Sequence, residues 1–175
     1  MFIIKWFERY PSVLFVLMAL TVWGLVAGGA LIELNDPFIL PCPMCIFQRY
    51  LYILIGVLAV MGAIAAKYSK KSIPLFSAII MIPSAVGVYV AATQSWMQWH
   101  PVEGAVCTSG GDDFYSMMEA LPLRDWIPIL FQGEGDCYAV DWTLLNLSIA
   151  NWSFIAFCCC VIAMLLMFIK GGKKA

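Results

Sequence analysis

Hydrophobic residues along the chain fall into four long, nearly continuous runs that are separated by more polar segments. Each run is close to the ~20 residues that an α-helix needs to cross a lipid bilayer. The runs cover residues 12–32, 46–66, 73–92 and 152–169. We therefore expect an all-α membrane protein, in which residues 1–175 form a single membrane domain built as a four-helix transmembrane bundle.

Charge differs between the segments that join these runs. Basic residues precede the first run, connect the second to the third and follow the fourth: Lys5, Arg9, Lys67, Lys70, Lys71, Lys170, Lys173 and Lys174. Because Lys and Arg favour the cytoplasmic side of a membrane, both termini are predicted to be cytoplasmic. The connections at residues 33–45 and 93–151 hold every acidic residue except Glu8, and we expect them to be loops on the outer side.

Composition agrees with a membrane protein, because 63% of the 175 residues are hydrophobic and only 12% are charged. The sequence contains no basic patch with interleaved aromatic residues, so nothing in it indicates a nucleic-acid partner. The first run could instead be a cleaved signal peptide, but it is longer than the ~7 to 15 apolar residues usual for one. The second outer loop holds an amphipathic run that predicts a short interfacial helix: Phe114, Tyr115, Met117, Met118 and Leu121.

Cys42 and Cys45 form a C-x-x-C motif where the first outer loop meets the second run. Two cysteines at this spacing can close a small disulfide ring, and free N–H groups at a helix N-terminus stabilise a thiolate. Arg49 follows four residues after Cys45, so on a helix it lies on the same face and adds positive potential. The motif is predicted to be redox-active. A structural disulfide is the alternative for the pair, and an interfacial anchor is the alternative for Arg49.

Cys107 and Cys137 lie thirty positions apart in the second outer loop. Alone, such a pair is typical of a stapled loop in an oxidising compartment. A protein with almost no soluble domain has little for two disulfides to stabilise. Two cysteine pairs on one face therefore favour redox chemistry instead. No second C-x-x-C is present and His100 is the only histidine, so no metal site is expected. The remaining cysteines lie within the fourth run and are expected to be structural: Cys158, Cys159 and Cys160.

Together these motifs resemble the DsbB family of bacterial membrane disulfide oxidoreductases, over nearly the whole chain. The resemblance rests on three segments with the cysteine pairs in this order: Pro41-Cys42-Pro43-Met44-Cys45-Ile46-Phe47-Gln48-Arg49, Leu121-Pro122-Leu123-Arg124-Asp125-Trp126-Ile127-Pro128, and Cys107 with Gly135-Asp136-Cys137. It implies a multi-pass protein of the bacterial inner membrane, with its active-site loops in the periplasm.

The resemblance also implies a function, which is to reoxidise a periplasmic DsbA-like thiol oxidase and to pass the electrons to a membrane quinone, ubiquinone or menaquinone. The partner would attack Cys107, the released Cys137 would exchange with Cys42, and the Cys45 thiolate would face the quinone. Arg49 would hold a quinone carbonyl oxygen. Some family members carry a histidine near the end of the third span, and Gln94 stands at that position as a second expected quinone ligand.

Two other readings compete with this one. An enzyme resembling vitamin K epoxide reductase also links loop cysteines to a quinone, but there the loop cysteines precede the C-x-x-C. A disulfide-stapled membrane scaffold or transporter subunit is the alternative that is not an enzyme. Transport would be favoured by a polar cluster at mid-membrane, and the runs show no such cluster beyond Ser77 and Ser84.

Overall fold

Four long α-helices dominate the computed structural model, which describes residues 11–36, 39–101, 127, 131, 135–140 and 142–172. The helices are α2 (Pro11–Asn35), α3 (Pro43–Tyr68), α4 (Ser72–Trp99) and α8 (Ile149–Gly172). Each is long and apolar enough to cross a membrane, with a mean hydropathy between 2.0 and 2.6. The expected all-α class with four spans is confirmed.

The helices extend further than the hydrophobic runs predicted. Helix α2 continues to Asn35 and α4 continues to Trp99, so Glu33 and Gln94 lie on helices where outer loops had been expected. The reason is physical: hydrophobicity stops where polar side chains begin, whereas backbone hydrogen bonding continues through polar residues as readily as through apolar ones. The predicted interfacial helix near residues 114–121 lies outside the described residues.

Proline and polar side chains set the beginnings of two helices. Helix α3 begins at Pro43, a residue suited to the first helical position because its missing N–H would have no partner there. Before α8, the hydroxyl of Ser148 accepts a hydrogen bond from the Asn151 N–H at 3.3 Å, as an N-cap does. Inside α4, Pro83 is tolerated, as is common in membrane helices.

The chain divides into two compact units, and every long helix contributes to both. The first unit contains residues 1–26, 51–86 and 156–175. Glycines allow close helix packing in it, since a Cβ at Gly56 would lie 2.1 Å from the Trp23 indole nitrogen. Tyr52 stacks on Phe157 with ring centroids 4.2 Å apart. Close helix contact at a glycine is therefore present in this unit.

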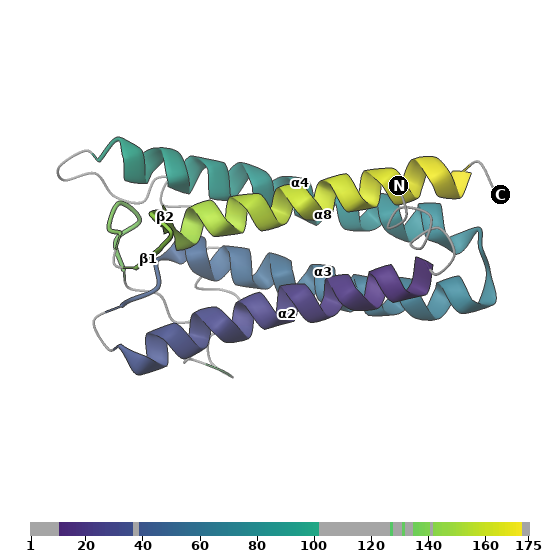
Figure 1. Cartoon of the computed structure of the whole chain (residues 1–175), viewed down its shortest axis with the longest axis horizontal. Coiled ribbons are helices and arrows are strands. Elements are labelled where there is room, and N and C mark those ends of the chain that lie inside the picture. The colour runs from purple at the N-terminus through teal and green to yellow at the C-terminus, as the bar shows by residue number, and fades with distance from the viewer. Residues whose placement is uncertain are drawn as a thin grey trace. The chain divides into compact units, whose positions relative to one another are not determined.

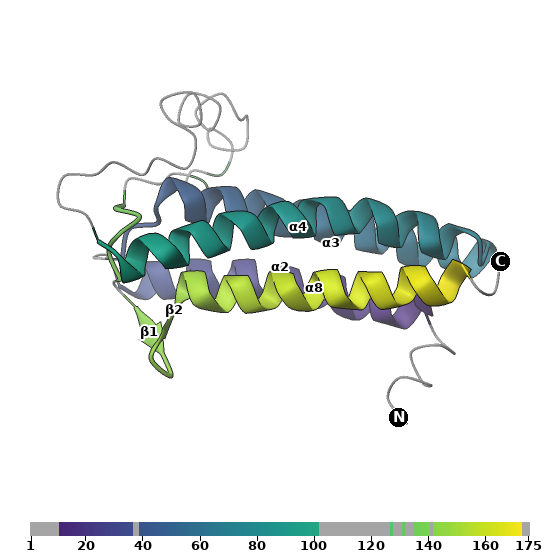
Figure 2. The ribbon, with the colours of Figure 1, turned by 90° about the horizontal axis from the view of Figure 1, so that it is seen from above.

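The second unit contains residues 27–50 and 87–155. In it the end of α2, the start of α3, the end of α4 and the start of α8 lie together with a small hairpin (Figure 1). The hairpin pairs β1 (Thr143–Leu144) with β2 (Leu147–Ser148) in antiparallel fashion. Leu145 and Asn146 between them have φ values of 54° and 61°, the left-handed pair of a tight type I′ turn. Figure 2 shows this hairpin projecting from the start of α8.

Candidate active site

The C-x-x-C motif forms the N-terminus of α3, inside the second unit. Cys42 is the N-cap, because its sulfur accepts the Cys45 backbone N–H at 3.4 Å and its carbonyl accepts the Ile46 N–H at 3.1 Å. Both cysteines are free thiols, and the Cys42 Sγ donates a hydrogen bond to the Cys45 Sγ at 3.1 Å. A disulfide of about 2.05 Å would need the sulfurs to approach by only about 1 Å.

The two thiols differ in environment. Cys42 is 3% exposed, whereas Cys45 is half-buried. The hydrogen bond that Cys42 shares with Cys45, together with burial, raises the pKa of the Cys42 thiol well above its usual range. Cys42 therefore keeps its proton in the reduced pair, and a thiolate forms at Cys45.

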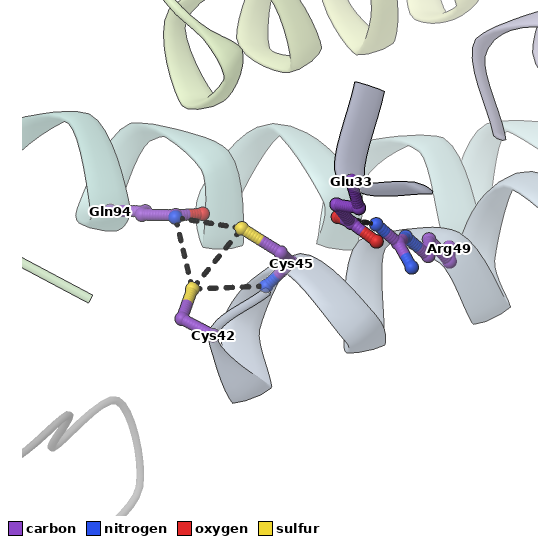
Figure 3. A network of polar contacts seen from close by, with 5 residues as sticks. All are labelled: Glu33, Cys42, Cys45, Arg49 and Gln94. Carbon is purple, nitrogen blue, oxygen red and sulfur yellow. Dashed lines mark hydrogen bonds and ion pairs between the residues drawn. The ribbon is translucent and has the colours of Figure 1, made fainter. Parts of the chain in front are cut away.

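Gln94 brings an amide from α4 to both sulfurs (Figure 3). Its Nε2 donates to the Cys42 Sγ at 3.2 Å and to the Cys45 Sγ at 3.1 Å. Its Oε1 accepts a hydrogen bond from the Gln48 Nε2 at 2.7 Å. Both glutamines are nearly inaccessible, with exposed fractions of 2% for Gln94 and 3% for Gln48. The predicted contact of Gln94 with a quinone stays a prediction, and its contact with the sulfurs had not been predicted.

Arg49 lies one helical turn after Cys45 on α3 and forms an ion pair with Glu33 from the last turns of α2 (Figure 3). The pair is largely buried, with exposed side-chain fractions of 8% for Arg49 and 13% for Glu33. Gly29, one turn before Glu33, would place a Cβ 3.9 Å from the Arg49 Nη2. Sequence reasoning identified Arg49 but missed Glu33, because that residue had been assigned to a loop.

Cys137 lies in the same unit as the C-x-x-C motif and is disulfide-bonded. It is completely buried and belongs to one apolar cluster with Cys42, Met44, Val90 and Met97. Cys45, Phe47 and Tyr138 pack against this cluster. The structure thus brings three of the four predicted catalytic cysteines together, while Cys107 lies outside the described residues.

Two hydrogen bonds to backbone carbonyls hold the Cys137 segment in place. The Gly135 N–H donates to the Pro41 carbonyl at 3.1 Å, directly beside Cys42. The approach is so close that a Cβ at Gly135 would lie 2.1 Å from the Leu40 carbonyl oxygen. On the other side of Cys137, the Gln98 Nε2 donates to the Ala139 carbonyl at 3.3 Å. Glycine at position 135 is therefore what lets the Cys137 segment lie against the C-x-x-C segment.

The remaining cysteines are free thiols on α8: Cys158, Cys159 and Cys160. Within the described ranges, no three His, Cys, Asp or Glu residues are grouped so that they could hold a metal ion. His100 is exposed and stacks on Trp96 with centroids 4.1 Å apart. None of these residues is among the side chains that surround the two free thiols of the motif.

Four apolar spans and a dithiol at a helix N-terminus, with a disulfide-bonded cysteine in the same apolar cluster, define a membrane thiol–disulfide protein. Comparison with known proteins gives the family. The model of the family described as "Disulfide bond formation protein DsbB" matches residues 8–167, and the chain belongs to that family. The resemblance noted from the cysteine motifs is confirmed, and the chain is an oxidoreductase of disulfide bond formation.

Individual relatives are similar to this chain over most of their length. "Disulfide bond formation protein B" of Acidovorax sp. (strain JS42) is 39% identical over 172 residues, which cover 98% of this chain and 95% of the relative. The protein of the same name from Verminephrobacter eiseniae (strain EF01-2) is 39% identical over 175 residues, covering 100% and 96%. That of Polaromonas naphthalenivorans (strain CJ2) is 44% identical over 147 residues, covering 84% of each.

Proposed function

We propose that this protein reoxidises a periplasmic DsbA-like thiol oxidase and passes the two electrons to ubiquinone or menaquinone in the membrane. The observation that carries the proposal is the apolar cluster shared by Cys137, Cys42 and Cys45. Thiol–disulfide exchange needs one sulfur to attack another directly, so cysteines that exchange must be close neighbours.

The exchange begins at the outer loop. A thiolate of the reduced partner attacks Cys107 of a Cys107–Cys137 disulfide, which forms a mixed disulfide and releases Cys137 as a thiolate. The second partner thiol displaces Cys107, so the partner leaves oxidised and the loop pair is left as a dithiol. Two electrons and two protons have then moved from the partner to the loop.

The next exchange takes place inside the cluster. Cys137 attacks Cys42 of an oxidised Cys42–Cys45 pair, which releases Cys45 as a thiolate, and Cys107 then closes the loop disulfide again. The loop is oxidised and the motif is reduced, with Cys42 protonated because of the high pKa of its thiol. Cys45 is the sulfur released in this step and the less buried of the two, so a lipid-soluble acceptor has access to it.

The residues around Cys45 fit a quinone. Arg49 supplies a buried guanidinium one turn away. A guanidinium is a donor suited to carbonyl oxygens. A bound quinone would supply the acceptor for the two electrons and two protons of the dithiol. Glu33 would keep Arg49 in place, since a buried guanidinium needs a counter-ion.

The proposed location is the bacterial inner membrane, with both termini in the cytoplasm and the active-site cysteines in the periplasm. Support comes from the two units: the first holds Lys67, Lys70, Lys71 and Lys170, and the second holds the described active-site cysteines. Reporter fusions test this directly. A periplasmic reporter should be active when fused after Gly111, and an active cytoplasmic reporter there would contradict the topology.

A reconstituted assay tests the function. Detergent-purified protein is mixed with a reduced thioredoxin-fold oxidase and ubiquinone or menaquinone, and quinone absorbance is followed. We expect one quinone reduced for each partner disulfide formed, and loss of the reaction in Cys45→Ala. With a reduced partner that keeps only its attacking cysteine, a mixed disulfide between Cys107 and the partner should accumulate, because the second partner thiol that displaces Cys107 is missing. A trapped complex through Cys42 would refute the assigned order.

A further inference from the structure

We propose that Gln94 is a catalytic residue that stabilises the reduced Cys42–Cys45 pair through hydrogen bonds to both sulfurs, and that Gln48 is the positioning residue that orients its amide. The proposal deepens the function proposed above and rests on it. It gives position 94 a role as a donor to sulfur, beside the predicted role as a quinone ligand.

The geometry uses the whole amide of Gln94. A side-chain amide has two N–H donors on one end and one acceptor oxygen on the other. Both sulfurs lie at hydrogen-bond distance from the donor end, at 3.2 Å and 3.1 Å. The acceptor end is satisfied by Gln48 at 2.7 Å. The orientation matters, because the opposite one would direct the carbonyl oxygen at a negatively charged sulfur.

Gln48 decides between these two orientations. It lies on α3, three residues after Cys45, and it is buried, so water does not compete for the oxygen of Gln94. Its Nε2 donates to that oxygen, so turning the Gln94 amide over would bring an amino group against an amino group. An unsatisfied polar group in such a buried position is costly, so the Gln94 amide cannot turn over unless the Gln48 amide turns with it.

The arrangement has a redox consequence. Reduction of the disulfide adds two electrons and leaves negative charge on Cys45, which is half-buried against an apolar cluster. The Gln94 N–H and the Cys42 S–H both donate to the Cys45 sulfur and stabilise that charge. Stabilising the reduced form makes the pair a stronger oxidant, which favours electron transfer from Cys137 to Cys42.

The test measures the equilibrium of the pair with glutathione, in quinone-free protein and without the partner. Full-length protein carrying Cys107→Ser and Cys137→Ser is incubated at fixed ratios of reduced to oxidised glutathione. Each protein disulfide takes two electrons from two glutathione molecules. Oxidation is quantified by mass spectrometry on the peptide that carries Cys42 and Cys45, so the cysteines of α8 do not interfere. The alkylation rate of Cys45 against pH is measured on the same peptide.

Gln94→Leu should shift the equilibrium roughly tenfold toward the disulfide, which corresponds to about 30 mV. The midpoint of Cys45 alkylation should move to higher pH. Gln48→Leu should shift both in the same direction by less, because the amide of Gln94 is still present but no longer oriented. The double variant should match Gln94→Leu alone, since Gln48 acts only through Gln94.

Thr93→Val is the matched control, because Thr93 lies next to Gln94 on α4 and its hydroxyl bonds to the Tyr89 carbonyl rather than to sulfur. It should leave the glutathione equilibrium unchanged. Gln94→Met provides a second variant without donors if the leucine variant does not fold. A wild-type equilibrium in the folded Gln94 variant, or additive shifts in the double variant, would overturn the proposal. Because no quinone is used, these outcomes are independent of quinone turnover.

Discussion

Arg49 is ion-paired with Glu33 on the neighbouring helix α2, and both side chains are largely buried. The guanidinium beside the reactive motif is therefore not a free surface cation. A buried charge needs a partner, and Glu33 fixes where the Arg49 side chain lies. The pair accordingly links the proposed chemistry of Arg49 to the stability of the second unit. The contribution of Arg49 to turnover and its contribution to stability therefore require separate measurements.

Arg49→Ala should lower quinone-dependent turnover by ~10²-fold or more, the usual loss for a charge-assisted donor at a developing oxyanion. Arg49→Lys should have a smaller defect, because it keeps the charge but loses the planar fork of donors. Steady-state turnover at several quinone concentrations measures both. Wild-type turnover in folded Arg49→Ala would reduce this residue to an interfacial anchor.

Glu33→Gln should destabilise the protein, because it keeps the shape of the side chain but removes the negative charge of Glu33 from beside the buried guanidinium. Removing one member of a buried pair typically costs about 3 to 5 kcal/mol. The free energy of unfolding in detergent, from a denaturant titration, measures the effect. Glu33→Ala combined with Arg49→Ala should be less destabilising than the two single changes added together. Strict additivity would show that the pair is not coupled.

Cys42 should resist alkylation at neutral pH, whereas Cys45 should react. The hydrogen bond to Cys45 and burial raise the pKa of the Cys42 thiol, and only the thiolate is the nucleophile. The group is neutral below its raised pKa, so labelling of Cys42 should begin only in strongly alkaline solution. Iodoacetamide labelling across pH, read by mass spectrometry for each cysteine, provides the measurement. Labelling of Cys42 before Cys45 would contradict this assignment.

Gly135→Ala should separate the Cys137 segment from the motif, because the added Cβ would lie 2.1 Å from the Leu40 carbonyl oxygen and 2.8 Å from its carbon. Backbone atoms cannot give way as a side chain can, so the segment has to move. A displacement of about 1 Å between reacting groups can cost ~10²-fold in rate.

The rate of exchange between Cys137 and Cys42, followed by quenched alkylation, should fall accordingly in Gly135→Ala. Gly28→Ala is the control, since a Cβ at that position has no atom within 4 Å. An unchanged rate in Gly135→Ala would show that the close approach to Leu40 does not position Cys137.

The four spans and the C-x-x-C at a helix start were predictable, because hydrophobic runs and local spacing lie within short stretches of sequence. The ends of the helices were not predictable from the sequence. Glu33 and Gln94 are polar, and a hydrophobicity pattern does not detect helical backbone beyond the apolar run. Contacts between distant positions were also beyond sequence reasoning. The Gln94 amide reaches Cys45 across 49 positions, and only the packing of α4 against α3 brings the two together.

The contact between Cys137 and the motif is of the same kind. Sequence order suggested an exchange through the resemblance alone, whereas the shared cluster gives it a physical basis. The close approach of Gly135 to Leu40 has a visible signal in the sequence, a glycine two positions before a cysteine. That signal does not name the partner segment, because a glycine shows that space is limited but not which atoms occupy it.

The central claim is that Cys137 takes the disulfide from the Cys42–Cys45 pair by bonding to Cys42, and the most direct test is to trap the Cys42–Cys137 bond. In a protein carrying Cys45→Ser and Cys107→Ser, the competing partners of both sulfurs are removed. Under mild oxidation, non-reducing peptide mapping should show a disulfide between Cys42 and Cys137 in most molecules. Failure to form this bond, with both cysteines still free or with Cys137 joined to another cysteine, would contradict the account.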